Sequence, residues 1–372
     1  TGSNNTAIGK DALMTNQTGS NNTALGYRSL EVNTANNNTA VGYKSLLANT
    51  SAAAVTGVGY QALAENTTGA ENTAVGSSAL GANTTGGQNT AMGAYALVAN
   101  TTGSDNVALG KNVLSTNTSG GYNVAVGNYS LNLNATGGNN TAIGFYALGK
   151  NTASNGTAVG ISALKENTTG SKNTAFGANA LEKNTSGNEN TALGSNALEK
   201  NTTASGNAAF GKSALQETTI GQYNTGSGSH SLQANVGGNY NTAHGYTSLY
   251  KNTSGNSNTS VGHNSLSENA TGDSNTAIGY GAGDAITTGS SNVYVGHGAD
   301  ASAGNVSNEI VIGHGATGTG NNQIALGNTS ITHIKAQVNS ITAYSDKRIK
   351  RNIDDSKLGL NFIMKLRPVT YK

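Results

Sequence analysis

The chain lacks most of the residues on which ordinary enzymes depend. Its 372 residues include no Cys, no Trp and one Pro, and only 10% are charged, whereas globular proteins carry about 25%. The absence of Cys excludes a disulfide scaffold, a thiolate zinc site and a Cys nucleophile. A single Pro excludes collagen and polyproline architectures. No apolar run approaches the roughly 18 residues that span a bilayer, so we expect no membrane insertion.

Neither sign of charge predominates over most of the chain. Residues 1–344 carry 12 basic and 15 acidic side chains, a balance of −3, whereas residues 345–372 carry 8 basic and 3 acidic, a balance of +5. A body without a basic patch does not favour a nucleic-acid partner. The change near residue 345 predicts a domain boundary. The chain opens inside a pattern at Thr1, without Met, and we expect it to be a fragment or a mature piece.

Glycine is abundant, with 52 residues, and it marks an internal repeat. The segment Asn22-Thr23-Ala24-Leu25-Gly26 recurs as residues 72–76 and again as 190–194. The Gly that ends each copy is spaced by 17 residues nearly throughout, with two spacings of 16 and a last one of 14. These anchor glycines are residues 9, 26, 42, 59, 76, 93, 110, 127, 144, 160, 177, 194, 211, 228, 245, 262, 279, 296, 313 and 327. Twenty copies in register predict a solenoid.

One repeat contains a short strand bounded by turn formers. Its alternation places Thr and an aliphatic residue on one face and Ala, present in 15 of 20 copies, on the other. A Leu follows four residues after the Gly in sixteen copies, from Leu13 to Leu266, which indicates an inward core position. Asn-Thr pairs such as Asn66-Thr67 and Asn100-Thr101, often with Gly two residues beyond, are predicted to form the corners by adopting left-handed conformations.

A helical solenoid needs about 33 or more residues per repeat, so the all-β alternative is favoured. We predict a parallel β-solenoid, or β-roll, of about twenty 17-residue coils. Coils that stack at about 4.8 Å form a rod of roughly 95 Å. Each coil holds only one Leu and one other aliphatic, a thin core for a free-standing cylinder. We therefore predict a homotrimeric rod, in which the Ala face meets neighbouring chains.

The regular pattern changes near the C-terminus. The Leu column ends at Gly283, and later repeats carry runs such as Glu309-Ile310-Val311-Ile312. We predict regular solenoid repeats over 1–282, irregular coils and a neck over 283–344, and a separate segment over 345–372.

Two resemblances carry the functional prediction. The repeated Asn-Thr-Ala-aliphatic-Gly with a following Ala-Leu resembles the left-handed β-roll of trimeric autotransporter adhesin heads, over about residues 1–327. The stretch from Ser345 to Ile353, followed by residues 366–371, resembles the opening of the endosialidase-type intramolecular chaperone domain of phage tail fibres, an α+β domain. That resemblance covers 28 residues. It implies a domain that assists trimer folding and then cleaves itself away at the motif Ser345-Asp346.

The residues themselves are compatible with that chemistry. A Ser hydroxyl is a weak nucleophile that needs a base nearby, and a Lys of lowered pKa serves as the base in Ser-Lys hydrolases. Lys350 lies five residues after Ser345, and the basic neighbours Lys347 and Arg348 favour its neutral amine. The family spacing places its Ser-Lys pair on Ser345 and Lys350. The alternative is an inert basic stretch that begins an amphipathic helix.

The remaining candidate sites are weaker. His263, His297 and His314 follow anchor glycines, but other residue types occupy the same position elsewhere, so a surface column is favoured over a metal site. Tyrosines at that position predict a stiffening aromatic stack rather than a sugar platform: Tyr27, Tyr43, Tyr60, Tyr246 and Tyr280. Sequons such as those at Asn66 and Asn167 follow from the repeat itself. No carboxylates recur at an offset that pairs them for glycosidic cleavage. We expect no cofactor and no metal.

We therefore predict a structural and adhesive fibre, the shaft or receptor-binding region of a phage tail fibre, in the virion or on an extracellular appendage. Its partners are two further copies of itself and a host or cell-surface receptor, a glycan or a surface protein. A bacterial surface trimeric adhesin is the alternative, and an ice-binding solenoid that presents its Thr column ranks third. We expect no activity on an external substrate, only autoproteolysis at Ser345 in the full-length precursor.

Self-cleavage is tested by the intact mass of the polypeptide expressed from the complete gene. We expect the wild-type protein to lose everything beyond residue 344 or 345, because Ser345 supplies the nucleophile, and the Ser345→Ala variant to stay whole. Intact mass spectrometry distinguishes the two products. If the wild-type protein also stays whole, Ser345 is not a nucleophile.

Overall fold

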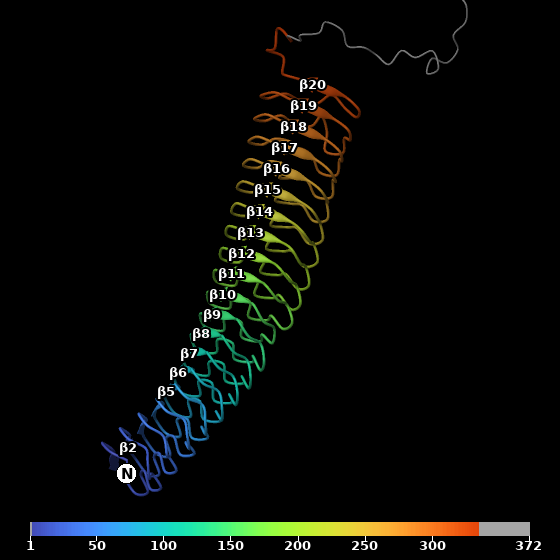
Figure 1. Ribbon diagram of the computed structural model, residues 1–372. Helices are drawn as coiled ribbons and strands as arrows, with labels where there is room; N and C mark the ends of the chain where they lie inside the picture. Colours follow the sequence, from blue (N-terminus) through green and yellow to red (C-terminus); the bar gives the residue numbers. More distant parts are fainter. Residues whose placement is uncertain (1, 335–372) are drawn as a thin grey trace, which may run out of the picture. The chain divides into compact units, whose positions relative to one another are not determined.

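Twenty parallel strands form one continuous sheet along a stack of coils (Figure 1). The computed structural model describes residues 2–334, and these contain no α-helix. The chain divides into two units, Thr1–Thr329 and Ser330–Lys372, and the solenoid lies within the first. The predicted all-β solenoid of about twenty 17-residue coils is confirmed. The predicted start of a chaperone domain lies outside the described residues, and the trimer stays a prediction.

Every strand is three residues long and follows a turn-rich segment. In chain order the strands are β1 (Thr6–Ile8), β2 (Thr23–Leu25), β3 (Thr39–Val41), β4 (Thr56–Val58), β5 (Thr73–Val75), β6 (Thr90–Met92), β7 (Val107–Leu109), β8 (Val124–Val126), β9 (Thr141–Ile143), β10 (Thr157–Val159), β11 (Thr174–Phe176), β12 (Thr191–Leu193), β13 (Ala208–Phe210), β14 (Thr225–Ser227), β15 (Thr242–His244), β16 (Thr259–Val261), β17 (Thr276–Ile278), β18 (Val293–Val295), β19 (Ile310–Ile312) and β20 (Ile324–Leu326).

The strands pair so that equivalent residues of successive repeats lie beside each other. In β10 and β11, for example, Thr157 pairs with Thr174 and Ala158 with Ala175. The two 16-residue spacings keep this register, since β2 still pairs Thr23 with Thr39 and β9 still pairs Thr141 with Thr157. Each side-chain type therefore forms a column that runs along the stack.

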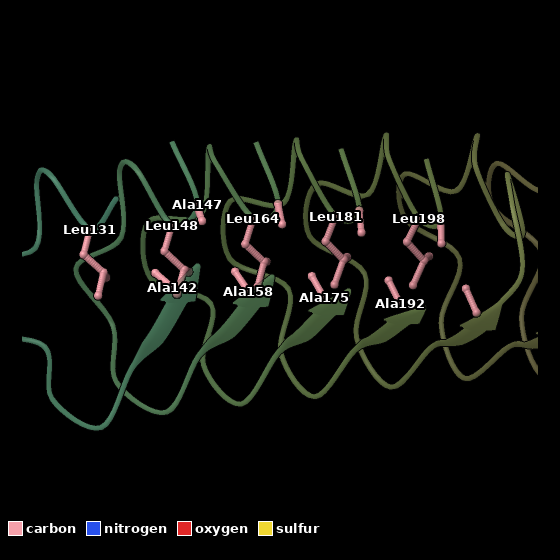
Figure 2. Packing of buried hydrophobic residues seen from close by; sticks show 14 of the residues in the cluster. Leu131, Ala142, Ala147, Leu148, Ala158, Leu164, Ala175, Leu181, Ala192 and Leu198 are labelled. Atoms are coloured by element: carbon pink, nitrogen blue, oxygen red, sulfur yellow. The ribbon is translucent and has the colours of Figure 1, made fainter. Parts of the chain in front are cut away.

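The core consists of a Leu column facing an Ala column (Figure 2). Leu164 and Leu181 point across the coil towards Ala158 and Ala175 at the strand centres, and all four are fully buried. The prediction that Leu points inward is confirmed. The prediction that Ala meets neighbouring chains is wrong, because the narrow coil needs a small strand residue opposite each Leu.

The Leu column has an unusual backbone conformation. Its φ angles lie between Leu131 at +47° and Leu63 at +53°, the left-handed region. That conformation costs a non-Gly residue about 1–2 kcal/mol. Full burial of a Leu side chain contributes about 1.5–3 kcal/mol. Each Leu is therefore held in an unfavourable backbone conformation by the burial of its own side chain.

The anchor glycines allow the coils to stack closely. Gly177 has a φ of +135°, and a Cβ built on it would lie 2.6 Å from the carbonyl carbon and oxygen of Gly194 in the next coil. Both the dihedral angle and the space exclude a side chain. The repeat thus requires Gly at this position for two reasons: its positive φ angle and the closeness of the next coil's backbone.

The second recurrent Gly serves a different purpose from the one predicted. Gly69 is not left-handed, but a Cβ there would lie 2.2 Å from the backbone oxygen of Gly86. Asn66, predicted as a left-handed corner, is instead fully buried without a positive φ. The prediction that these residues adopt left-handed conformations is therefore wrong. Gly69 is required because the next coil's backbone lies so close, and Asn66 because its side chain forms hydrogen bonds between coils.

Buried asparagines form two columns of side-chain hydrogen bonds. In the first column, Asn83 Nδ2 donates to Asn66 Oδ1 at 2.7 Å and to the Gly86 carbonyl at 2.8 Å. In the second, the Asn89 backbone N–H donates to Asn72 Oδ1 at 2.9 Å. Asparagine carries both a donor and an acceptor, so each coil satisfies its neighbours. The interior tolerates these polar side chains because nearly all of their buried donors and acceptors form hydrogen bonds.

Beyond residue 282 the Leu and Asn columns are interrupted, and larger side chains from neighbouring coils fill the space. Gly283 stands in the Leu column, and the ring of Tyr294 fills the vacated space: a Cβ on Gly283 would lie 2.6 Å from Tyr294 Cδ2. Glu309 replaces an Asn and is fully buried. Its carboxylate accepts hydrogen bonds from Tyr294 Oη at 3.3 Å and from the Gly320 backbone N–H at 2.8 Å. Burial, followed by the Glu309 charge, raises the pKa of Tyr294 above its usual range.

Interruptions of the first Asn column leave polar atoms without a hydrogen bond. Among the described residues, four buried side-chain atoms have none: Asn134 Oδ1, Asn201 Oδ1, Thr218 Oγ1 and Asn269 Oδ1. Thr218 takes the place of an Asn directly after Asn201, and Ile286 takes the place that follows Asn269. The unpaired acceptors of Asn201 and Asn269 therefore mark substitutions in the column. Asn134 differs, because Asn151 follows it and donates to the Ala153 carbonyl instead.

Restoring the column at Thr218 should stabilise the protein. In Thr218→Asn, the new amide donates to Asn201 Oδ1 and joins two separate stretches of the column. Satisfying a buried polar group is worth about 1–3 kcal/mol, so we expect the free energy of unfolding to rise by about that amount in denaturant titration. Thr219→Asn, one residue along and only half-buried, is the matched control and should change little. A loss of stability in Thr218→Asn would contradict the pairing.

Candidate interaction surface

The third residue of each strand forms a column on the outside of the sheet, here called the outer column. It is apolar in eighteen of the twenty strands, and it is interrupted by Ser227 and His244. Its most exposed large members retain between 37% and 59% of their accessible surface. They are Ile8, Leu25, Val75, Met92, Ile143, Phe176, Leu193, Phe210, Val261, Ile278, Ile312 and Leu326. An apolar strip of this length, broken at only two adjacent strands, is unusual on a monomeric protein.

Threonine lines the same face of the sheet. The first residue of each strand is Thr in fourteen of twenty strands, and Val107, Val124 and Ala208 interrupt the run in mid-chain. Most of these Thr side chains are half-buried, so the face combines methyl groups with hydroxyls. The predicted grouping of Thr and the aliphatic residue on one face is confirmed, and that face is the outer one.

Aromatic rings stack along a second surface column, directly after the anchor glycines. Tyr43 lies with its ring centroid 5.4 Å from Tyr27 and 5.3 Å from Tyr60. A longer stack has spacings of 5.0–5.2 Å and consists of Tyr246, His263, Tyr280, His297 and His314. The rings cover each other's faces, so only their edges remain accessible between neighbours. This geometry supports the predicted stiffening stack over a platform for sugar rings.

The sequon asparagines are structural. Asn66 and Asn167 are buried, and each amide nitrogen donates to the preceding Asn of its column, Asn167 to Asn151 at 2.7 Å. A side chain in that position is inaccessible to a glycan in the folded solenoid.

Two carboxylates come together where the coils become irregular, a pairing that the sequence analysis missed. Burial, and then the hydrogen bond and charge of Asp300, raise the pKa of the Asp284 carboxyl to about 6. Asp300 Oδ1 also accepts hydrogen bonds from the backbone N–H groups of Ala285 at 3.1 Å and Ala301 at 2.8 Å. The two residues sit at different offsets from their anchor glycines, so the repeat pattern conceals their proximity.

The predicted catalytic residues Ser345, Asp346 and Lys350 lie outside the described residues. Within the described part of one chain, no three His, Cys, Asp or Glu side chains are grouped as a metal site. The same residues contain no helix long and apolar enough to cross a membrane.

The comparisons with known proteins add no relative. A scan against protein-family models found no match to the chain, and a search of curated proteins found no similar sequence.

The Asp284–Asp300 pair predicts a pH dependence of stability. Because the folded protein raises the pKa of Asp284 from an ordinary value near 4 to about 6, the protonated form is favoured in the folded state. The stabilising contribution is complete below about pH 4 and is lost as the pH rises through 6. In wild-type protein this term should lower the unfolding temperature between pH 4.5 and 7.5, by the equivalent of roughly 1 kcal/mol after solvent screening.

Asp284→Asn removes the titrating group, so that this part of the pH dependence disappears in thermal unfolding followed by circular dichroism. Asp105→Asn, in a regular coil far along the stack, should leave the wild-type profile unchanged. Identical profiles for wild type and Asp284→Asn would show that the pair is not coupled.

Proposed function

We propose that this chain is the structural and adhesive part of a homotrimeric fibre, of the phage tail-fibre type. The outer column is the observation that carries the proposal. Eighteen apolar side chains face outward along one strip, although the coil has a complete Leu–Ala core without them. Apolar groups in such a regular exposed row favour burial against another surface.

The strip has the extent of a specific interface. Side chains of this type that are about half exposed add up to an area on the order of 1,000 Å² per chain, the range in which stable interfaces begin. Because the row runs parallel to the stack of coils, copies related by rotation about a parallel axis bring equivalent rungs together. Closed cyclic symmetry of that kind is the common solution for identical subunits.

The threefold symmetry and the viral setting are supported by the two sequence resemblances. The adhesin-head β-roll assembles from three chains, and the endosialidase-type chaperone domain follows trimeric fibres. In that setting the segment from Ser345 assists trimer assembly in the precursor and is then released.

Adhesion is assigned to the surface that trimer formation leaves free. Outside the outer column the stack presents positions that differ from coil to coil, such as the ring edges of Tyr280 and His297 and the inter-coil pair of Lys200 and Glu217, whose charged atoms lie 2.6 Å apart. A host glycan or surface protein is the receptor class that suits such a long polar surface. A bacterial adhesin would use the same rod and differ in what anchors it.

Ice binding is the third candidate, after the fibre and the bacterial adhesin, and it rests on the outward Thr column. Fourteen hydroxyl-bearing side chains repeat with the strand spacing on the outer face. The trimer and the ice-binding surface require the same face, so the two functions exclude each other. A monomeric rod with thermal hysteresis would favour ice binding.

The trimer is tested by placing charges in the outer column. The triple variant Phe176→Glu, Leu193→Glu and Phe210→Glu puts three carboxylates on consecutive rungs of β11–β13. Since the burial of unpaired charges is strongly unfavourable, we expect the variant to sediment as a monomer where wild-type protein sediments as a trimer. Analytical ultracentrifugation gives the mass directly.

The matched control uses exposed apolar residues outside the outer column. Ile161 and Ile220 are 59% and 60% exposed, and Ile161→Glu with Ile220→Glu should remain trimeric. Circular dichroism establishes that each variant keeps its solenoid. A wild-type chain that sediments as a monomer at micromolar concentration overturns the proposal.

A further inference from the structure

The outer column contains two polar residues, and they are adjacent. Ser227 ends β14 and His244 ends β15, and the two are direct partners in the strand pairing. Phe210 precedes them and Val261 follows them in the same column. Along twenty rungs the strip is therefore apolar except for one two-rung break, which concentrates an imidazole and a hydroxyl at one level of the rod.

Within the single chain His244 has no structural task. Its side chain is exposed on the outer face, and among the described residues it makes no hydrogen bond, ion pair or ring contact. Other histidines of the same region do: His230 Nδ1 lies 2.8 Å from Gln233 Oε1, and His263 is stacked between two tyrosines. The free imidazole thus stands on the face that the proposed trimer closes.

Trimer formation changes the surroundings of this imidazole. If the outer column faces the threefold axis, His244 of each chain lies at the same height, with apolar rungs on both sides of the break. A polar group buried among apolar side chains needs a partner. The column offers no carboxylate or ammonium group, and its neighbours on the same face are Thr225, Thr242 and Thr259.

Three neutral imidazoles that converge on an axis form a well-known ligand set. Tetrahedral Zn²⁺ with three His ligands leaves its fourth position to a water or an anion, and imidazole suits Zn²⁺, Ni²⁺ and Cu²⁺ in general. Ser227 is smaller than the apolar residues that occupy the other rungs, so it leaves room below the histidines for that fourth ligand and supplies a hydroxyl to it.

Although the sequence alone predicted no metal, we propose that His244 of three chains binds one divalent transition-metal ion, with Zn²⁺ as the best match, on the axis of the fibre. The inference rests on the proposed trimer, since one chain supplies a single ligand. The ion would replace apolar packing at this level and link the three chains within the regular coils, at β15.

The test uses the full 372-residue chain, prepared without a polyhistidine tag, treated with chelator and then equilibrated with zinc sulfate. We expect one tightly held Zn²⁺ per three chains by elemental analysis, and a zinc-dependent rise in the unfolding temperature. Co²⁺ in place of Zn²⁺ should give the visible absorption of a tetrahedral site. His244→Val restores the apolar column and should stay trimeric, with the bound ion and the zinc-dependent rise both lost.

A second variant, His244→Gln, keeps a polar side chain and should also lose the ion. His263→Gln, which alters an exposed histidine in the aromatic stack, is the matched control and should keep the ion. Equal loss in His263→Gln, or a trimer that holds no zinc, overturns the metal site and leaves the fibre proposal standing. A monomer in ultracentrifugation overturns the fibre proposal, and the metal site with it.

Discussion

The close approach of backbone to backbone at the anchor glycines determines the rest of this fold. Where a Cβ on Gly177 would lie 2.6 Å from Gly194, no other residue allows the next coil to lie at strand spacing. This contact fixes the height of each coil, and the height in turn brings equivalent side chains within hydrogen-bonding and stacking distance. The Leu–Ala core, the Asn columns and the aromatic stacks all depend on that spacing.

The composition follows from the same constraint. A coil of this width has space for one Leu opposite one Ala, and the remaining interior positions lie against backbone carbonyl and N–H groups. Asparagine satisfies those groups and its neighbours at once, as Asn83 does with Asn66 and Gly86, so a chain with few large apolar residues still fills its interior. Low charge and frequent Asn, Thr and Gly are thus properties of a narrow solenoid rather than of disorder.

The sequence predicted the solenoid, its period and the inward Leu because these depend on repetition alone. It did not predict which strand face lies inside, since Ala and the aliphatic residue alternate and either face fits a two-residue period. The left-handed conformation of Leu was also missed, because Leu rarely adopts it. The proximity of Asp284 and Asp300 depends on a local change of coil geometry that no repeat pattern reveals. The Ala face, predicted to meet neighbouring chains, is therefore the inner face of the coil, and the trimer inferred from the small core stays a prediction.

The packing of the Tyr294 ring beside Gly283, where other coils carry a Leu, affects how the chain finds its register. A coil that pairs with the wrong neighbour, one repeat too early or too late, recovers nearly all of its contacts, because successive repeats are almost identical. Gly283 and Tyr294 break this degeneracy: the large ring fits only above the coil that lacks its Leu. A slipped alignment would set Tyr294 against a Leu, and would leave the space beside Gly283 empty. The irregular coils thus fix the alignment of the chain at one end, and the nearly identical coils that precede them take their register from that end.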